Sequence, residues 1–294
     1  MTSNRILTCA SVLAALSFPL VAQQEKPPAA TPTTTTIQTQ QTKLLRVGAD
    51  VTGSSVVTPK NEPLGKVEDL VIHPKGEIAF VELSGAGATR TGAYRYPVPW
   101  RALDRNEHGQ LVLATTPDEF VKYPRYEKAN LTAMDWWADA DRAYSKLVAE
   151  KASPAEATTS LAPAKKMYLA SDLRARPVEN PEGEKVAMMH EIVVDPRAGR
   201  IAYVVLAVGG AAGTGEKMIA VPWEALQLMP DKSNPQLERL TLSTTREQLE
   251  KAPEFLATAE GWTAASEPAY VLSVYESCSI PPYRIVEIKE APKQ

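Results

Sequence analysis

The sequence predicts a mainly β protein with two small β-barrels in tandem, each followed by a helical segment, behind a disordered N-terminal tether. Three observations predict this architecture: an internal duplication, short β-type alternations in both copies, and a Thr-, Gln- and Pro-rich stretch ahead of the first copy. The composition is that of a soluble globular protein, since 44% of the residues are hydrophobic and 23% are charged.

The first 22 residues have the layout of a secretory signal peptide. Arg5 precedes a mainly apolar run at 6–20, and Ala22 is a small residue suited to a cleavage site. Because the run is short for a membrane-spanning helix, we expect cleavage, a periplasmic or secreted product and no stable membrane span in the mature protein. An uncleaved N-terminal anchor is the alternative. Residues 23–43 are expected to form the disordered tether.

The duplication becomes visible when Gly76 is placed on Gly199. Over the 28 positions 76–103 and 199–226, 14 residues are identical, whereas unrelated segments of average composition share about two. The copies end in PVPWRAL and AVPWEAL, and the equivalence continues on both sides. The sequence therefore predicts a first barrel at 44–127 and a second barrel at 165–257.

The strands EIAFVEL and RIAYVVL alternate with period two, as half-buried strands do. We predict that the face shared by the two copies packs on the barrel cores; its members are Ala79, Val81, Leu83, Ala202, Val204 and Leu206. The opposite face is not simply polar and is expected to be partly covered.

The two VPW motifs are expected to form the same structural corner of each barrel. Pro99 and Pro222 cannot donate a ladder hydrogen bond, and Trp100 and Trp223 supply large apolar area where the chain turns. The alternative is that the two indole rings present ligand-stacking surfaces.

This ordered set of features resembles the PRC-barrel domain, the small barrel named after the photosynthetic reaction centre H subunit and found also in ribosome maturation factors. The matching features are the opening Leu64-Gly65-Lys66-Val67, the Pro-Gly hairpin into IAFVEL, and VPW-x-AL. They cover roughly 44–126 and 166–257, although the second copy opens with Val186-Ala187 in place of Leu64-Gly65. The resemblance implies two small barrels and a role in protein binding, because known members mostly bind other proteins.

The segments outside the barrels carry aromatic residues at helical spacing. We predict a helix at 128–151, a linker at 152–164, and a helix followed by a C-terminal strand at 258–294. These aromatic side chains either lie back on their own barrel or form a partner surface. The candidate interaction residues are Trp136, Trp137, Tyr144, Trp262 and Tyr270.

No residue pattern in the sequence indicates catalysis, a metal site or a cofactor. The three histidines are far apart, the glycine-rich segment 209–218 lacks the order of a phosphate-binding loop, and signal cleavage would leave Cys278 without a disulfide partner. A net charge of −3 provides no basic field for nucleic acid.

The sequence thus predicts a non-enzymatic exported protein that serves as an adaptor for unknown partner proteins of the cell envelope. Two alternatives stay open. One is a small-molecule-binding protein with its site between the barrels, and the other is an uncharacterised hydrolase whose residues come from distant segments.

Overall fold

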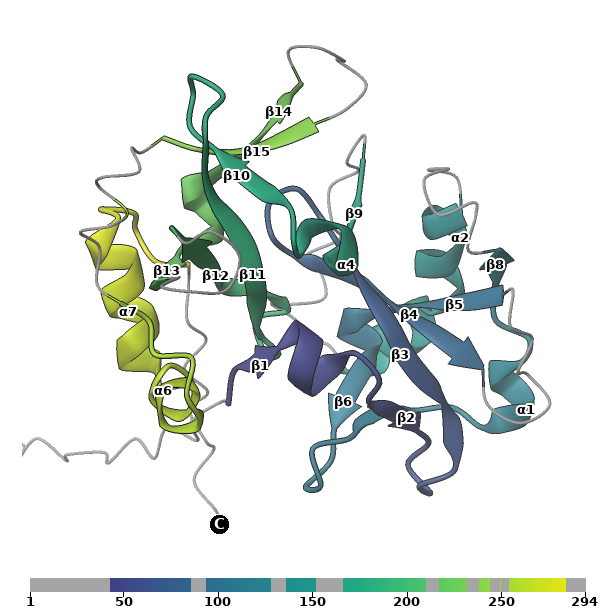
Figure 1. Ribbon diagram of the computed structural model, residues 1–294. Helices are drawn as coiled ribbons and strands as arrows, with labels where there is room; N and C mark the ends of the chain where they lie inside the picture. The colour runs from purple at the N-terminus through teal and green to yellow at the C-terminus, as the bar shows by residue number, and fades with distance from the viewer. Residues whose placement is uncertain are drawn as a thin grey trace, which may run out of the picture. The chain divides into compact units, whose positions relative to one another are not determined.

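Each repeat forms one mixed β-sheet (Figure 1). Six strands follow the same order in the two sheets, and β8 (Tyr126–Glu127) of the first sheet has no counterpart among the described strands of the second. The computed structural model describes residues 43–85, 94–127, 136–151, 166–209, 217–231, 238–243, 249 and 254–283, all within the unit Thr39–Gln294. The fold is mainly β, with helices after each barrel domain, as the sequence predicts.

The first sheet runs in the order β6-β7-β2-β3-β4-β5-β8. Its strands are β2 (Ser55–Val57), β3 (Pro63–Ile72), β4 (Ile78–Gly85), β5 (Tyr94–Pro99), β6 (Leu103–Arg105), β7 (Leu111–Leu113) and β8 (Tyr126–Glu127).

The second sheet runs β14-β15-β10-β11-β12-β13. Its strands are β10 (Pro177–Glu179), β11 (Lys185–Asp195), β12 (Arg200–Val208), β13 (Lys217–Val221), β14 (Leu226–Pro230) and β15 (Glu238–Leu242). In both sheets the long central strands are antiparallel, and one parallel pair, β2–β7 or β10–β15, brings the last hairpin back to the first strand.

The strand that opens each repeat pairs with the sheet of the other repeat. Strand β1 (Leu45–Arg46) lies antiparallel to β11, and β9 (Tyr168–Leu169) lies antiparallel to β3. A short turn follows each strand: the π-turn η1 (Val47–Val51) after β1 and the helix α4 (Ala170–Leu173) after β9. The π-turn has one residue more than its counterpart, which matches the single extra residue of the first repeat in this segment.

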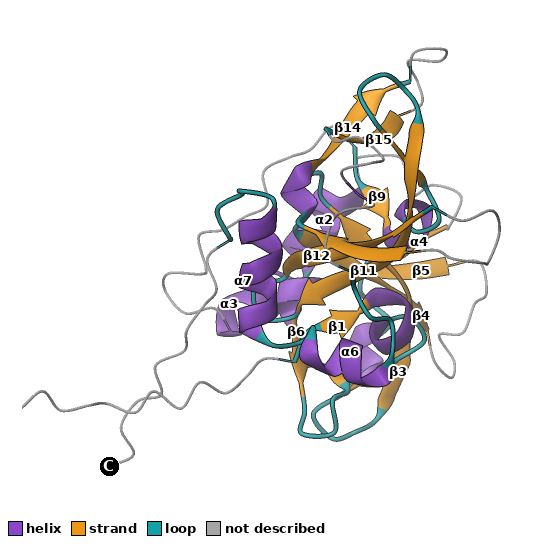
Figure 2. Ribbon diagram, turned by 60° about the vertical axis from the view of Figure 1, so that its left-hand side comes forward, coloured by secondary structure: helices purple, strands orange, loops and turns teal. Residues whose placement is uncertain are grey.

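Helices lie at the barrel corners and after each barrel. The corner elements are the 3₁₀ turns η3 (Trp100–Ala102) and η5 (Trp223–Ala225) and the helix α1 (Pro117–Phe120), which Thr116 caps by accepting from the Glu119 amide. Helices α2 (Trp136–Ala143) and α3 (Ser145–Lys151) follow the first barrel. Helices α6 (Ala259–Ala264) and α7 (Pro268–Ser277) follow the second, and α7 contacts β12 and β13 (Figure 2).

One hydrophobic core contains buried side chains from both repeats, including Val81, Leu83, Val204 and Leu206. Smaller clusters form on the outer sheet faces. Helix α2 covers Val71 and Phe80 in the first repeat, and α6 and α7 cover Tyr203, Val205 and neighbouring residues in the second.

The predicted inward face is wrong at its first position in each copy. Ala79 and Ala202 belong to the outer clusters, whereas Ile78 and Ile201 lie in the shared core. The register explains this, because Phe80 pairs with Val71 while Ile78 pairs with Ile72, which leaves Ala79 as the extra residue of a β-bulge. The second repeat has the same irregularity at Ala202.

Several sequence predictions fall outside the described residues. These are the signal peptide, the tether up to residue 42, the whole linker 152–164, both glycine-rich hairpin loops, and the C-terminal strand beyond Tyr283.

Candidate functional site

The two VPW corners cross over between the repeats. Trp100 and Trp223 are buried, with 6% and 3% of their surfaces exposed. Nε1 of Trp223 donates to the carbonyl of Pro74 at 2.9 Å, and Nε1 of Trp100 donates to the carbonyl of Pro196 at 3.1 Å. Each indole therefore packs on the hairpin turn of the opposite repeat, and the preceding residues Pro99 and Pro222 are the N-caps of η3 and η5.

The hairpin turns are shaped to receive these indoles. Gly76 and Gly199 have positive φ values of 87° and 62°, which glycine adopts without steric cost. A Cβ at Gly76 would lie 2.6 Å from Cδ1 of Trp223, and one at Gly199 would lie 3.2 Å from Cδ1 of Trp100. A side chain at either position would thus push against the indole that the turn supports.

Backbone hydrogen bonds join the two turns reciprocally. The Ile78 amide donates to the carbonyl of Gly199, and the Ile201 amide donates to the carbonyl of Gly76, both at 2.8 Å. We call this contact the seam; its residues are Pro74, Gly76, Ile78 and Trp100 from the first repeat and Pro196, Gly199, Ile201 and Trp223 from the second. The reciprocity gives the seam an approximate two-fold relation.

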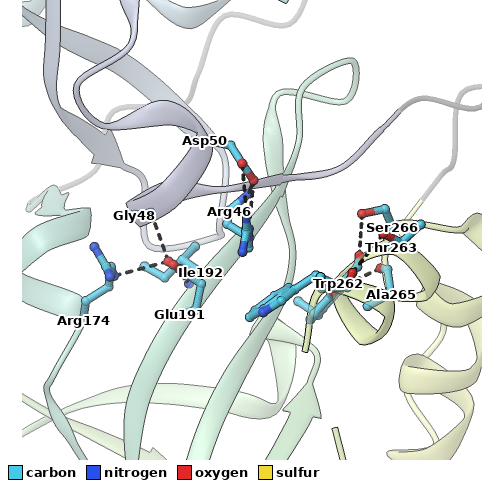
Figure 3. A network of polar contacts seen from close by, with 12 residues as sticks. Arg46, Gly48, Asp50, Arg174, Glu191, Ile192, Trp262, Thr263, Ala265 and Ser266 are labelled. Atoms are coloured by element: carbon cyan, nitrogen blue, oxygen red, sulfur yellow. Dashed lines mark hydrogen bonds and ion pairs between the residues drawn. The ribbon is translucent and has the colours of Figure 1, made fainter. Parts of the chain in front are cut away.

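Equivalent carboxylates hold the exchanged strands at both ends. In the second repeat, Oε1 of Glu191 accepts from the Gly48 amide at 3.1 Å and from its own neighbour Ile192 at 3.0 Å (Figure 3). In the first repeat, Oδ1 of Asp69 accepts from the Ser171 amide at 3.2 Å and from Leu70 at 2.7 Å.

The two carboxylates differ in their charge environment. Arg174 Nε lies 3.2 Å from Glu191 Oε1, which forms an ion pair (Figure 3). No cation pairs with Asp69 among the described residues, and burial raises its pKa above the usual value of 3.8 despite the hydrogen bonds from Ser171 and Leu70. Ionised Asp69 therefore carries a desolvation cost without a paired cation, whereas the charge of Glu191 is paired with Arg174.

The Asp69→Asn variant should be as stable as the wild type at pH 7, or more stable. The amide oxygen can still accept both backbone bonds, and the buried charge is removed. Because the raised pKa means that the folded state binds the Asp69 proton more tightly, stability falls as pH rises from about 3.8 through the raised value. Urea unfolding at several pH values should show this slope in the wild type and a smaller one in Asp69→Asn.

The matched control is Glu191→Gln, which removes the charge that faces Arg174. Its free energy of unfolding should fall by about 1–3 kcal/mol at pH 7 because a partly buried guanidinium loses its partner. A loss of the same size in Asp69→Asn would show that the two carboxylates are equivalent and would contradict this account.

The candidate aromatic residues of the first repeat lie on their own barrel. Trp137 is half-buried and meets Phe80 edge-on, with ring centroids 6.2 Å apart. Tyr144 is fully buried and stacks on Tyr123 at 4.2 Å. The side chain of Trp136 lies outside the described residues.

The candidates of the second repeat are half-buried on the barrel. The ring centroids of Trp262 and Phe255 are 4.6 Å apart. The Arg46 guanidinium lies 5.0 Å from the Trp262 ring centroid and also pairs with Asp50 (Figure 3). Tyr270 lies 5.7 Å from the ring of Tyr203. Two exposed leucines belong to the same region of the chain, Leu256 at 60% exposure and Leu272 at 38%.

The Tyr144→Phe variant should retain the stability of the wild type. The Tyr144 hydroxyl is buried, and it has no hydrogen-bond partner among the described residues, so its removal relieves a desolvation cost. Tyr203→Phe is the matched control, since the Tyr203 hydroxyl donates to the Ala265 carbonyl at 2.9 Å. Thermal unfolding should show a loss of about 1 kcal/mol for the control alone; equal losses would contradict the assignment.

The described residues contain no group of three or more His, Cys, Asp or Glu side chains placed to hold a metal ion. Within the same part of the chain, no helix is long and apolar enough to cross a membrane. Cys278 is a half-buried free thiol.

Two copies of one small barrel, joined through equivalent corners, define a tandem-barrel protein. The family model of the PRC-barrel domain matches residues 48–121 and 165–234. The chain is therefore a tandem PRC-barrel protein, and the resemblance seen in the sequence is confirmed. No curated protein matches the chain. PRC-barrel domains are generally non-catalytic modules.

The Val-Pro-Trp corners were identified from the sequence but their partners were not, and the glycine turns, Asp69 and Glu191 were not named as site residues. Gly76 and Gly199 occur at equivalent positions in both copies, and this was the available signal for a close approach. That each glycine receives the tryptophan of the other repeat, and that Glu191 pairs with Arg174, depends on contacts that no local pattern encodes.

Proposed function

We propose that the chain is a non-catalytic exported protein that acts as a protein-interaction adaptor in the cell envelope. The observation that carries this proposal is the pair of PRC-barrel domains, a module that is generally non-catalytic. The N-terminal apolar segment with Arg5 and Ala22 supports export.

The part of the described chain best suited to a protein partner is formed by Leu256 and the helices α6 and α7, and we call it the α6–α7 surface. The seam uses the large aromatic corners within the chain, so Trp100 and Trp223 are not available to a ligand. Leu256, which precedes α6, and Leu272 of α7 are exposed, whereas Trp262 of α6 and Tyr270 of α7 are half-buried. Exposed apolar side chains and aromatic residues are both typical of protein interfaces.

Native mass spectrometry of the protein gently extracted from the envelope of its host tests this proposal. We expect a mature chain that starts at Gln23 and a heavier species that contains one further protein subunit. The double variant Leu256→Ser/Leu272→Ser should lose the heavier species. The control Val121→Ser/Met229→Ser, which removes two other exposed apolar side chains, should keep it.

Other masses would count against the adaptor role. An excess mass of a few hundred daltons would instead support the small-molecule-binding alternative. A bare chain in every sample would contradict a stable complex, and a chain that retains residues 1–22 would contradict cleavage.

A further inference from the structure

We propose that the seam selects its partner by charge: the first repeat accepts a second repeat and disfavours another copy of itself, and Glu77 and Arg200 make this choice. The inference concerns the pairing of the repeats and does not depend on the proposed adaptor role.

Glu77 and Arg200 lie opposite each other at the centre of the seam. They form an antiparallel bridge pair between the repeats, flanked by the two reciprocal hydrogen bonds of Ile78 and Ile201. Directly opposite residues of an antiparallel pair have Cβ atoms about 5 Å apart on the same face. The Arg200 guanidinium also donates to the carbonyl of Lys75 in the first repeat at 3.3 Å.

The same two residues are equivalent positions of the duplication, since Gly76 aligns with Gly199. An approximate two-fold relation therefore brings position 77 of one repeat against its own counterpart in the other. A pair of first repeats would place Glu77 against Glu77, and a pair of second repeats would place Arg200 against Arg200. Like charges directly opposite each other are destabilising, whereas Glu77 and Arg200 have opposite charges. The side-chain contact of the Glu77 carboxylate is with Nδ1 of His73, at 3.0 Å.

A second pair of equivalent residues repeats the reversal of sign. Oε1 of Glu224 in η5 lies 2.5 Å from Nη2 of Arg200. The counterpart of Glu224 in η3 is Arg101, which pairs with Asp141. The first repeat thus carries Glu77 and Arg101, and the second carries Arg200 and Glu224. This reversal lies beside otherwise shared features of the seam, namely the glycine turns and the tryptophan corners.

The consequence is control over association between chains. A chain with two self-complementary repeats could join further chains through like repeats and grow into open assemblies. Opposite charges at the centre favour closure of the seam within one chain, where the linker also gives the two repeats a high effective concentration.

The test uses the folded full chain with a protease site introduced into the linker 152–164. After folding and cutting, the protein is incubated in sub-denaturing urea so that the halves can exchange partners. The halves differ in mass, so native mass spectrometry distinguishes mixed pairs from like pairs. We expect mixed pairs only, and like pairs at comparable abundance would overturn the proposal.

A double-mutant cycle then assigns the selectivity to the central charges. In the intact chain, Glu77→Arg should lower the equilibrium constant of folding about tenfold in the wild-type background and much less in the Arg200→Gln background, because the repulsion needs both charges. The difference should shrink as salt is added. An equal loss in both backgrounds, or no loss in either, would overturn the role of this pair.

Discussion

Replacing Gly76 with alanine is expected to lower the free energy of unfolding by about 2–4 kcal/mol. Two costs combine. An alanine at a φ of 87° carries backbone strain of about 1–2 kcal/mol. The added Cβ would also lie 2.6 Å from Trp223 Cδ1, so the indole must move and disturb its hydrogen bond to Pro74.

Gly53→Ala separates these two costs. Gly53 has a similar φ of 82°, and nothing lies within 4 Å of the position of its Cβ. Its loss should be limited to the backbone strain of about 1–2 kcal/mol. Chemical denaturation of both variants gives the contribution of the seam as the difference, and equal losses would show that Gly76 does not support the indole.

Replacing Trp223 with alanine is expected to cost about 3–5 kcal/mol, the largest effect among the single substitutions considered. The indole is 97% buried at the junction of the two repeats, and its removal leaves a cavity in the shared core. Trp100→Ala should have a similar effect, because its indole occupies the equivalent place in the other repeat.

Trp223→Phe distinguishes packing from hydrogen bonding. Phenylalanine retains much of the apolar area but cannot donate to the Pro74 carbonyl, so we expect a smaller loss of about 1–2 kcal/mol. Urea unfolding of the three variants provides the comparison. Losses below about 1 kcal/mol for both alanine variants would show that the repeats do not depend on these corners.

The architecture was predictable because the two copies share residues that specific backbone conformations require. Glycine at a positive φ and the Val-Pro-Trp corner recur at fixed positions in both copies, and this recurrence predicted the mainly β, tandem fold that the structure has. The bulges were not predictable, since Ala79 and Ala202 look like ordinary members of an alternating strand. The structure shows each as the extra residue that shifts the alternation.

The candidate site was predictable only in part. Equivalence in sequence does not say whether Trp100 packs on its own turn or on that of the other repeat, because both arrangements satisfy the same local pattern. Likewise, the exchange of β1 and β9 follows from pairing over more than 90 residues, which periodicity does not encode. The charge reversal at Glu77 and Arg200 was visible in the aligned copies. That the two positions lie opposite each other is known only from the structure.

Hydrogen exchange at the amides of Ile78 and Ile201 tests the seam most directly. Each amide donates across the repeats, so we predict exchange as slow as that of amides in the middle of β4 and β12. Their protection should be lost in parallel in Gly76→Ala. If the two amides instead exchange at the rate of exposed turn residues while the strands stay protected, the barrels are not joined in this way.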